Sequence, residues 1–172
     1  MDFDKYPVTL MLIAANILFS IVGFSNNIFL SKTIGWPYYE KRNKEYYRFI
    51  TSGFLHADWI HLFFNMFTLY FFGKNLEIIL SVSGLGGKFS YLSLYFLGLI
   101  AADIPSYLKH NEDADYRSLG ASGAVSAVIF ASIIFVPGPV FIYTEPYKFQ
   151  QPSMQFCMLF IVFTWAKKIK TM

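Results

Sequence analysis

The chain has 172 residues, of which 55% are hydrophobic and 20% aromatic, and its mean hydropathy is +0.44. This composition is too apolar for an ordinary soluble domain and predicts an integral membrane protein. The net charge is +3, but the 14 Lys and Arg residues are scattered between apolar runs, so nucleic-acid binding is not expected. The single cysteine, Cys157, cannot form a disulfide or a cysteine metal site on its own.

Apolar runs along the chain predict membrane helices, because none of them alternates in the way a barrel strand does. The expected class is therefore an all-α helical bundle. Four runs are long enough to span a membrane, with the third ended by Pro105 and the fourth closed by Pro137: 8–24, 53–73, 89–104 and 119–136. A fifth run at 154–166 is short, and its crossing of the membrane is left open.

The segment 25–52 differs in composition from the apolar runs around it. Aromatic residues alternate there with basic ones, namely Trp36, Tyr38, Tyr39, Tyr46, Tyr47 and Phe49 with Lys41, Arg42, Lys44 and Arg48. Such mixtures are typical of segments at the membrane–water interface, where rings lie at the headgroup level. We expect a long interfacial loop, for which membrane anchoring is the simplest role.

Polar residues in the second run are candidates for a functional site. His61 and Asn65 are four positions apart and share a helix face, and Asp58 and Thr68 extend the same stripe. His56 is five positions from His61, so at about 100° per residue the two rings are expected to be well separated around the helix, which argues against a histidine metal site. Hydrogen bonding of His61 and Asn65 to neighbouring helices is the alternative to a catalytic role.

Ser122 lies between two glycines, in "GASGA" near the start of the fourth run. If the helices cross alternately, His61 is about 12 Å and Ser122 about 5 Å below the same membrane face, at about 1.5 Å per residue. A serine in a first helical turn has free backbone amides beside it, which can hold an oxyanion. Gly120 and Gly123 allow close approach of a neighbour. Taken alone, the motif also fits simple small-residue helix packing.

Together, "FLHADWIHLFFNM", "GASGA" and "YYRF" resemble motifs of the rhomboid family of intramembrane serine proteases. The resemblance implies that Ser122 is the nucleophile and that His61 and Asn65, with the Ser122 amide, stabilise the oxyanion. Gly120 belongs to the same motif. The resemblance also implies transmembrane protein substrates taken from the lipid bilayer, with no metal and no organic cofactor.

The family takes its general base from a histidine on a sixth core helix, whereas the last histidine of this chain, His110, precedes Ser122. We therefore expect a rhomboid-like bundle with five of the six core transmembrane helices, truncated at its C-terminus and lacking the base. Without the sixth helix, Gly120, Ala124, Ala127 and Ala131 are expected to form a stripe of small residues with no partner.

These observations predict one rhomboid-like membrane domain over 1–172, with the interfacial loop 25–52 and an atypical C-terminal segment 139–172. The expected location is multi-pass in a bacterial cytoplasmic membrane. The expected function is an intramembrane serine endopeptidase that is inactive in this chain, through a frameshift, a premature stop or an incomplete gene. The alternative is a non-catalytic rhomboid-like binder of membrane proteins. A substitute base at His61 or His110 and a channel or transporter are weaker alternatives.

Overall fold

The computed structural model describes residues 3–135, and all its regular elements in that range are helices, which confirms the all-α class. Within it, the only strand-like feature is an isolated bridge between Gly35 and Ser118. The elements, in chain order, are η1 (Phe3–Lys5), α1 (Pro7–Ser25), α2 (Asn27–Thr33), α3 (Pro37–Asn43), α4 (Arg48–Thr51), η2 (Ser52–Phe54), α5 (Trp59–Val82), α6 (Gly87–His110) and α7 (Ser122–Phe135).

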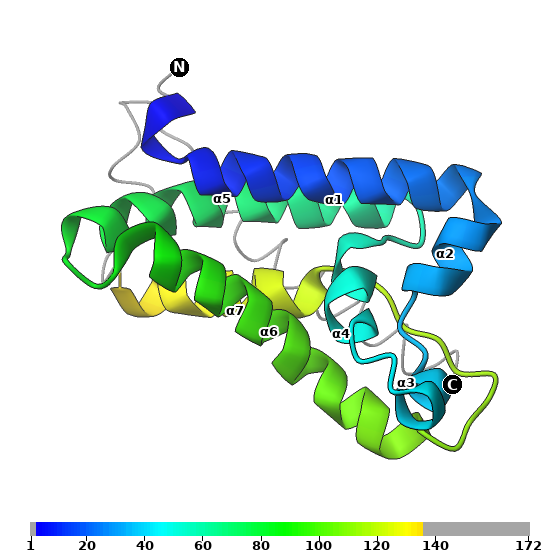
Figure 1. Cartoon of the computed structure of the whole chain (residues 1–172). Coiled ribbons are helices and arrows are strands. Elements are labelled where there is room, and N and C mark those ends of the chain that lie inside the picture. Colours follow the sequence, from blue (N-terminus) through cyan, green and yellow to red (C-terminus); the bar gives the residue numbers. More distant parts are fainter. Residues whose placement is uncertain (1–2, 136–172) are drawn as a thin grey trace.

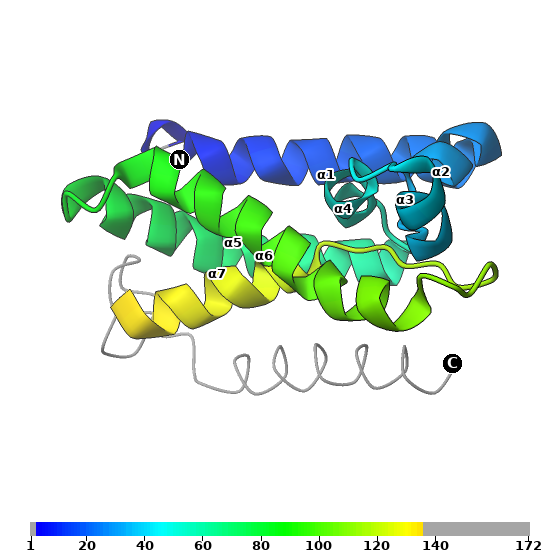
Figure 2. The same ribbon diagram turned by 60° about the horizontal axis from the view of Figure 1, so that its bottom comes forward.

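Helix α5 is the centre of the bundle, because α1, α6 and α7 all pack against it (Figure 1). Leu69 and Leu76 of α5 are fully buried in this core, as are Tyr91 and Tyr95 of α6. Figure 2 shows α7 lying under α6, with α2, α3 and α4 gathered at one end of the long helices.

The sequence predicted that the second apolar run forms one helix, and this prediction is wrong. Asp58 has an extended backbone, and its carboxylate accepts a hydrogen bond from the His61 amide at 2.7 Å, so α5 begins at Trp59. Residues 52–54 form the separate turn η2. At its other end α5 continues past Gly73 to Val82, because its later polar residue Glu77 is fully buried among hydrogen-bond donors.

The prediction that Pro105 ends the third helix is wrong, because α6 continues through Pro105 to His110. A proline removes one helical hydrogen bond, a cost that favourable packing elsewhere can outweigh. The continuation packs against α3 and α4, and its Tyr107 ring lies 5.5 Å from the Phe49 ring. This contact between distant segments was not visible in the local sequence.

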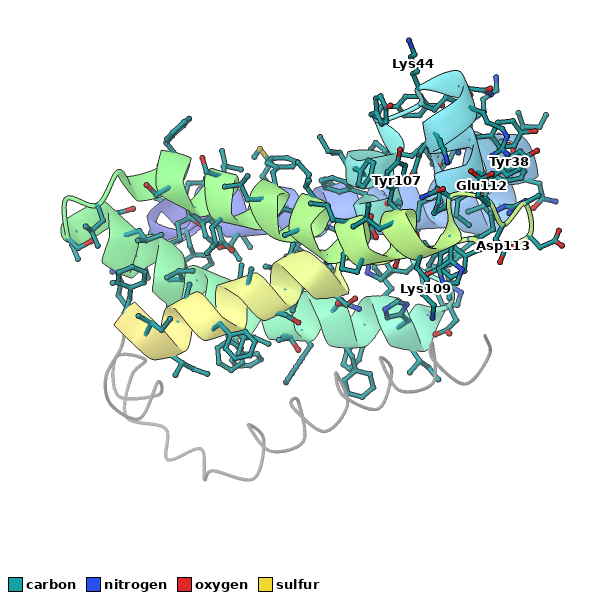
Figure 3. The ribbon with its side chains drawn as sticks, turned by 90° about the horizontal axis from the view of Figure 1, so that it is seen from below. Tyr38, Lys44, Tyr107, Lys109, Glu112 and Asp113 are labelled. Atoms are coloured by element: carbon teal, nitrogen blue, oxygen red, sulfur yellow. The ribbon has the colours of Figure 1, made fainter. Side chains whose placement is uncertain are left out.

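The segment 25–52 folds into three short helices that hold the loop between α6 and α7. Gly35 and Ser118 exchange both backbone hydrogen bonds, at 2.9 Å each, and the Trp36 indole donates to the Ala114 carbonyl at 3.1 Å. The Arg117 guanidinium lies over the Trp36 ring. Figure 3 shows Tyr38 and Lys44 at the same end of the molecule as Glu112 and Asp113. Placement of this segment at a membrane interface stays a prediction.

Two of the described helices, α1 and α6, are long and apolar enough to cross a membrane by length and composition, and α7 is a shorter apolar helix. The number of spans predicted from the sequence is thus not established by the structure. The fifth run at 154–166 and the atypical segment 139–172 lie outside the described residues.

Small residues bring α6 and α7 into close contact. A Cβ atom added to Gly98 would lie 2.9 Å from the Ala127 Cβ, and one added to Gly123 would lie 2.2 Å from the Ala102 Cβ. Ala124 and Ala131 are buried, and Gly120 lies against His61. The expectation of a small-residue stripe with no partner is therefore wrong, because α6 and His61 cover it.

Candidate active site

The first two turns of α5 carry two of the candidate residues, His61 and Asn65. His61 lies in the first turn, only about 3 Å along the helix from Trp59, and not about 12 Å down a helix that starts at Gly53. Asn65 is one turn further on and 6% exposed, and its side-chain amide donates to the His61 carbonyl at 2.9 Å. The shared face of His61 and Asn65 is as predicted, whereas Asp58 is the exposed N-cap of the helix rather than part of that face.

Ser122 is in the first turn of α7, as predicted, but the helix begins at Ser122 itself and not at Leu119. The chain leading to it is fixed by backbone hydrogen bonds, since the Gly120 amide donates to the Ser52 carbonyl at 3.0 Å. Gly120 also has a φ of +124°, a conformation that favours glycine. These contacts orient the start of α7 toward the start of α5.

The meeting point of the two helices is Gly120 against the His61 ring. A Cβ at position 120 would lie 2.8 Å from His61 Cε1 and 3.3 Å from Nε2, so only a glycine leaves room for the imidazole. Ser122 follows two residues later and is partly buried. The structure thus places Gly120 against the His61 ring, with Asn65 one turn further along α5 and Ser122 two residues after Gly120.

His56 lies next to His61, contrary to the prediction that the two rings are far apart. Their centroids are 5.0 Å apart and their planes are inclined by 70°. The prediction failed because it placed His56 on the helix, whereas His56 lies in the connection between η2 and α5 and is free to fold back. Asp58, a residue type favoured at N-caps, was the sequence signal for this break.

Burial determines the charge of His56. Its side chain is 3% exposed and its Nδ1 lies 2.9 Å from the Ser20 hydroxyl of α1. Loss of solvent, with a smaller contribution from the neighbouring His61, lowers the pKa of His56 from 6.5 to about 3. His56 is therefore neutral at pH 7. Neither Ser20 nor His56 was a candidate site residue from the sequence, and no local pattern links two residues so far apart.

His110 lies in a different setting from His56 and His61. Its ring stacks on Tyr116 at a centroid distance of 3.9 Å, and its Nδ1 is 3.7 Å from Asp113 Oδ2. His110 is the last residue of α6, and both partners belong to the loop that follows it. Over residues 3–135, the structure holds no cluster of three His, Cys, Asp or Glu side chains that could bind a metal ion.

The geometry suits stabilisation of a negative oxygen more clearly than it suits proton removal. The first amides of α7 have no partner within the helix and lie at the positive end of its dipole. The His61 imidazole from α5 lies against Gly120, two residues before α7, and the Asn65 amide is one turn further along α5. Backbone amides and His and Asn side chains are among the usual components of an oxyanion hole.

Comparisons with known proteins indicate which family the chain belongs to. Residues 43–169 match the family model described as "Rhomboid domain". The chain is 39% identical over 89 residues to "Rhomboid-like protein 11, chloroplastic" of Arabidopsis thaliana, which covers 52% of this chain and 29% of the relative. It is 37% identical over 83 residues to "Putative rhomboid protease YdcA" of Bacillus subtilis, covering 48% and 38% of the two chains.

A third relative, "Rhomboid protease GlpG" of Haemophilus influenzae, is 27% identical over 125 residues, which cover 71% of this chain and 59% of the relative. The chain spans less than two thirds of the length of each of these three relatives. The family model, in contrast, covers most of the chain and includes both helices that meet at Gly120 and His61. The chain therefore belongs to the rhomboid family.

Proposed function

We propose that this chain carries the nucleophile and oxyanion-binding half of a rhomboid-type intramembrane serine endopeptidase site. The single observation that carries the proposal is the packing of Gly120 against His61, which joins the first turns of α7 and α5. In this proposal Ser122 is the nucleophile, His61 and Asn65 stabilise the oxyanion, and Gly120 makes room for them.

Membership of the rhomboid family makes the chain an integral membrane protein. We propose that α1, α5, α6 and α7 are four of its core transmembrane helices, and that the fifth apolar run supplies another. Its substrates in this proposal are transmembrane segments that unwind to expose a peptide carbonyl. The relatives include one plant protein and two bacterial proteins, so location in a bacterial cytoplasmic membrane stays a prediction.

In the proposed reaction the Ser122 oxygen attacks the substrate carbonyl, and its proton passes to a general base. The oxygen of the tetrahedral intermediate then accepts hydrogen bonds from the Ser122 amide, His61 and Asn65. All three histidines of the sequence precede Ser122, whereas the family resemblance implies a base on a later helix. We therefore expect reaction at Ser122 to be slow unless a base is supplied.

Labelling with a fluorophosphonate tests the proposal, because this probe reacts covalently with an activated serine. The full chain, purified in detergent, is incubated with the probe with and without added imidazole, which can replace a missing histidine base. The expected result is labelling that increases with imidazole and is abolished by Ser122→Ala. Ser126→Ala, one turn further along α7, is the matched control and is expected to label like the unaltered chain.

The outcomes separate the candidate functions. Labelling that survives Ser122→Ala contradicts the assignment of the nucleophile. Full labelling without imidazole contradicts the expected lack of a base. A chain that folds but does not label under either condition supports the alternative, a rhomboid-like protein that binds membrane proteins without cleaving them.

A further inference from the structure

A buried polar chain leads from α1 to the candidate site. Ser20 of α1 is fully buried, its hydroxyl donates to the Phe54 carbonyl at 3.1 Å, and its oxygen lies 2.9 Å from His56 Nδ1. The opposite ring nitrogen, His56 Nε2, is buried and has no partner within residues 3–135. The His56 ring stands beside the His61 ring, with 5.0 Å between centroids.

The hydrogen bonds of Ser20 determine where the proton of His56 lies. A hydroxyl has a single proton, and Ser20 uses it toward the Phe54 carbonyl. For the contact with His56 to be a hydrogen bond as well, the imidazole Nδ1 must carry the proton and donate it to Ser20. In the opposite tautomer, Ser20 would donate to His56 and the Phe54 carbonyl would lose this donor. Nε2 would then carry a buried N–H without a partner, and a buried donor without a partner is rarer than a buried acceptor without one.

We propose that Ser20 is a positioning residue of the candidate site, which holds His56 in the tautomer protonated at Nδ1 and leaves Nε2 as a hydrogen-bond acceptor beside His61. The structural part of this inference does not depend on catalysis. Its consequence for reactivity rests on the proposed function of His61 and Ser122.

Two neighbours, Gly120 and His56, restrain the His61 ring. Gly120 leaves no room for a Cβ atom beside the imidazole, and the planes of the His56 and His61 rings are inclined by 70°. Rings inclined at such angles place the electron-poor edge of one against the face of the other. A fixed, neutral His56 therefore limits how the His61 ring can turn, and a ring aimed in advance stabilises an oxyanion better than a mobile one.

Nuclear magnetic resonance of the full chain in detergent micelles tests the inference directly. The sequence has only three histidines, so selective ¹⁵N labelling gives few ring signals, and a His110→Gln variant removes one set for assignment. The expected result at pH 7 is a His56 ring with its proton on Nδ1 and a bare Nε2. In Ser20→Ala, the Nδ1 proton loses its acceptor, and the ring signals of both His56 and His61 are expected to shift.

Ser132→Ala is the matched control. Ser132 is also fully buried, and its hydroxyl also bonds to backbone carbonyls, those of Phe72 and Val128, but it is on α7 and its hydrogen bonds do not involve His56. This variant is expected to leave the ring signals of His56 and His61 unchanged. If Ser20→Ala does not fold, the tautomer of His56 in the unaltered chain still tests whether Nδ1 carries the proton. Ser20→Cys, which keeps a weak acceptor, then tests whether Ser20 positions the two rings.

A proton on Nε2 of His56 in the unaltered chain overturns the inference, and so do His61 signals that do not respond to the Ser20 substitution. The rate of fluorophosphonate labelling at Ser122 is a separate readout, expected to fall by up to about 100-fold in Ser20→Ala and to stay unchanged in Ser132→Ala. A chain that gives the expected ring signals but does not label refutes the proposed function and leaves the assignment of Ser20 and His56 intact.

Discussion

The buried polar groups among the long helices and the surface ion pairs at the end formed by α2, α3 and α4 lie in opposite settings, although that end also buries Glu40 and Arg48. Among the long helices the interior is polar at several points, where Thr9, Asn16, Ser20 and Glu77 are all fully buried. Their outer surface exposes large apolar side chains, including Leu18, Phe63, Leu97 and Phe130. At the other end, Lys41 and Arg42 of α3 pair with Glu112 on the surface.

With the long helices in the membrane and the other end in water, as proposed, this difference follows from the solvent that each region meets. In lipid, a polar group without a partner is costly, so polar side chains turn inward and bond to each other or to backbone. In water, charged groups are already well solvated, and their pairing contributes little. The same residue type is therefore expected to matter greatly in one region and hardly at all in the other.

Glu77→Gln is expected to have the largest effect. The Glu77 carboxylate accepts hydrogen bonds from the Val8 amide at 2.9 Å and from the Thr9 amide and hydroxyl at 2.8 Å, and so caps the first turn of α1. Glutamine keeps the shape but turns an NH₂ group toward these donors. We expect a loss of about 3 kcal/mol in the free energy of unfolding, measured by thermal or denaturant unfolding in detergent.

Ser81→Ala is the control for this substitution. Ser81 is on the same helix, and its hydroxyl donates to the Glu77 carbonyl within that helix, at 2.7 Å. This variant should unfold close to the unaltered chain. A Glu77→Gln variant that is equally stable would show that the buried carboxylate does not hold α1 to α5, and the comparison between the two regions would lose its strongest example.

The contrast between regions was partly predictable from the sequence. The apolar runs predicted the long helices, because a run of about twenty apolar residues is typical of a membrane-spanning helix. The spacing of His61 and Asn65 predicted that they share a helix face. The start of α5 was missed, since the apolar residues before Trp59 hide the break that Asp58 marks. The link between Ser20 and His56 was missed for a different reason, as it joins two elements through a contact that no periodicity encodes.

The pH dependence of stability sharpens the comparison at His56. Its pKa in the folded chain, about 3, is below the ordinary value of 6.5, so the unfolded chain takes up a proton first as the pH falls. Stability from this group is therefore complete above about pH 6.5 and decreases progressively down to about pH 3. Between about pH 7.5 and about pH 5.5 the loss should be roughly 1 kcal/mol.

His56→Gln separates this loss from the titration of other groups. Glutamine does not titrate, so the pH dependence of unfolding in this variant should be shallower over the same range, with the difference between the two chains attributable to the imidazole. Equal pH dependence in both chains would mean that His56 is solvated in the folded protein. The structural reason for the expected difference is the 3% exposure of His56.

Glu112→Gln is expected to have the smallest effect and completes the comparison with Glu77→Gln, because the chemical change is identical. Lys41 and Arg42 lower the pKa of the Glu112 carboxyl through their hydrogen bonds, yet its side chain is 66% exposed. Water solvates both the paired and the separated charges, so unfolding should be indistinguishable from that of the unaltered chain, and added salt should change neither. A loss of stability comparable to that of Glu77→Gln would mean that this end of the molecule does not face water. The α2–α4 segment and the loop after α6 would then lie in a medium as poor in hydrogen-bond partners as the bundle interior.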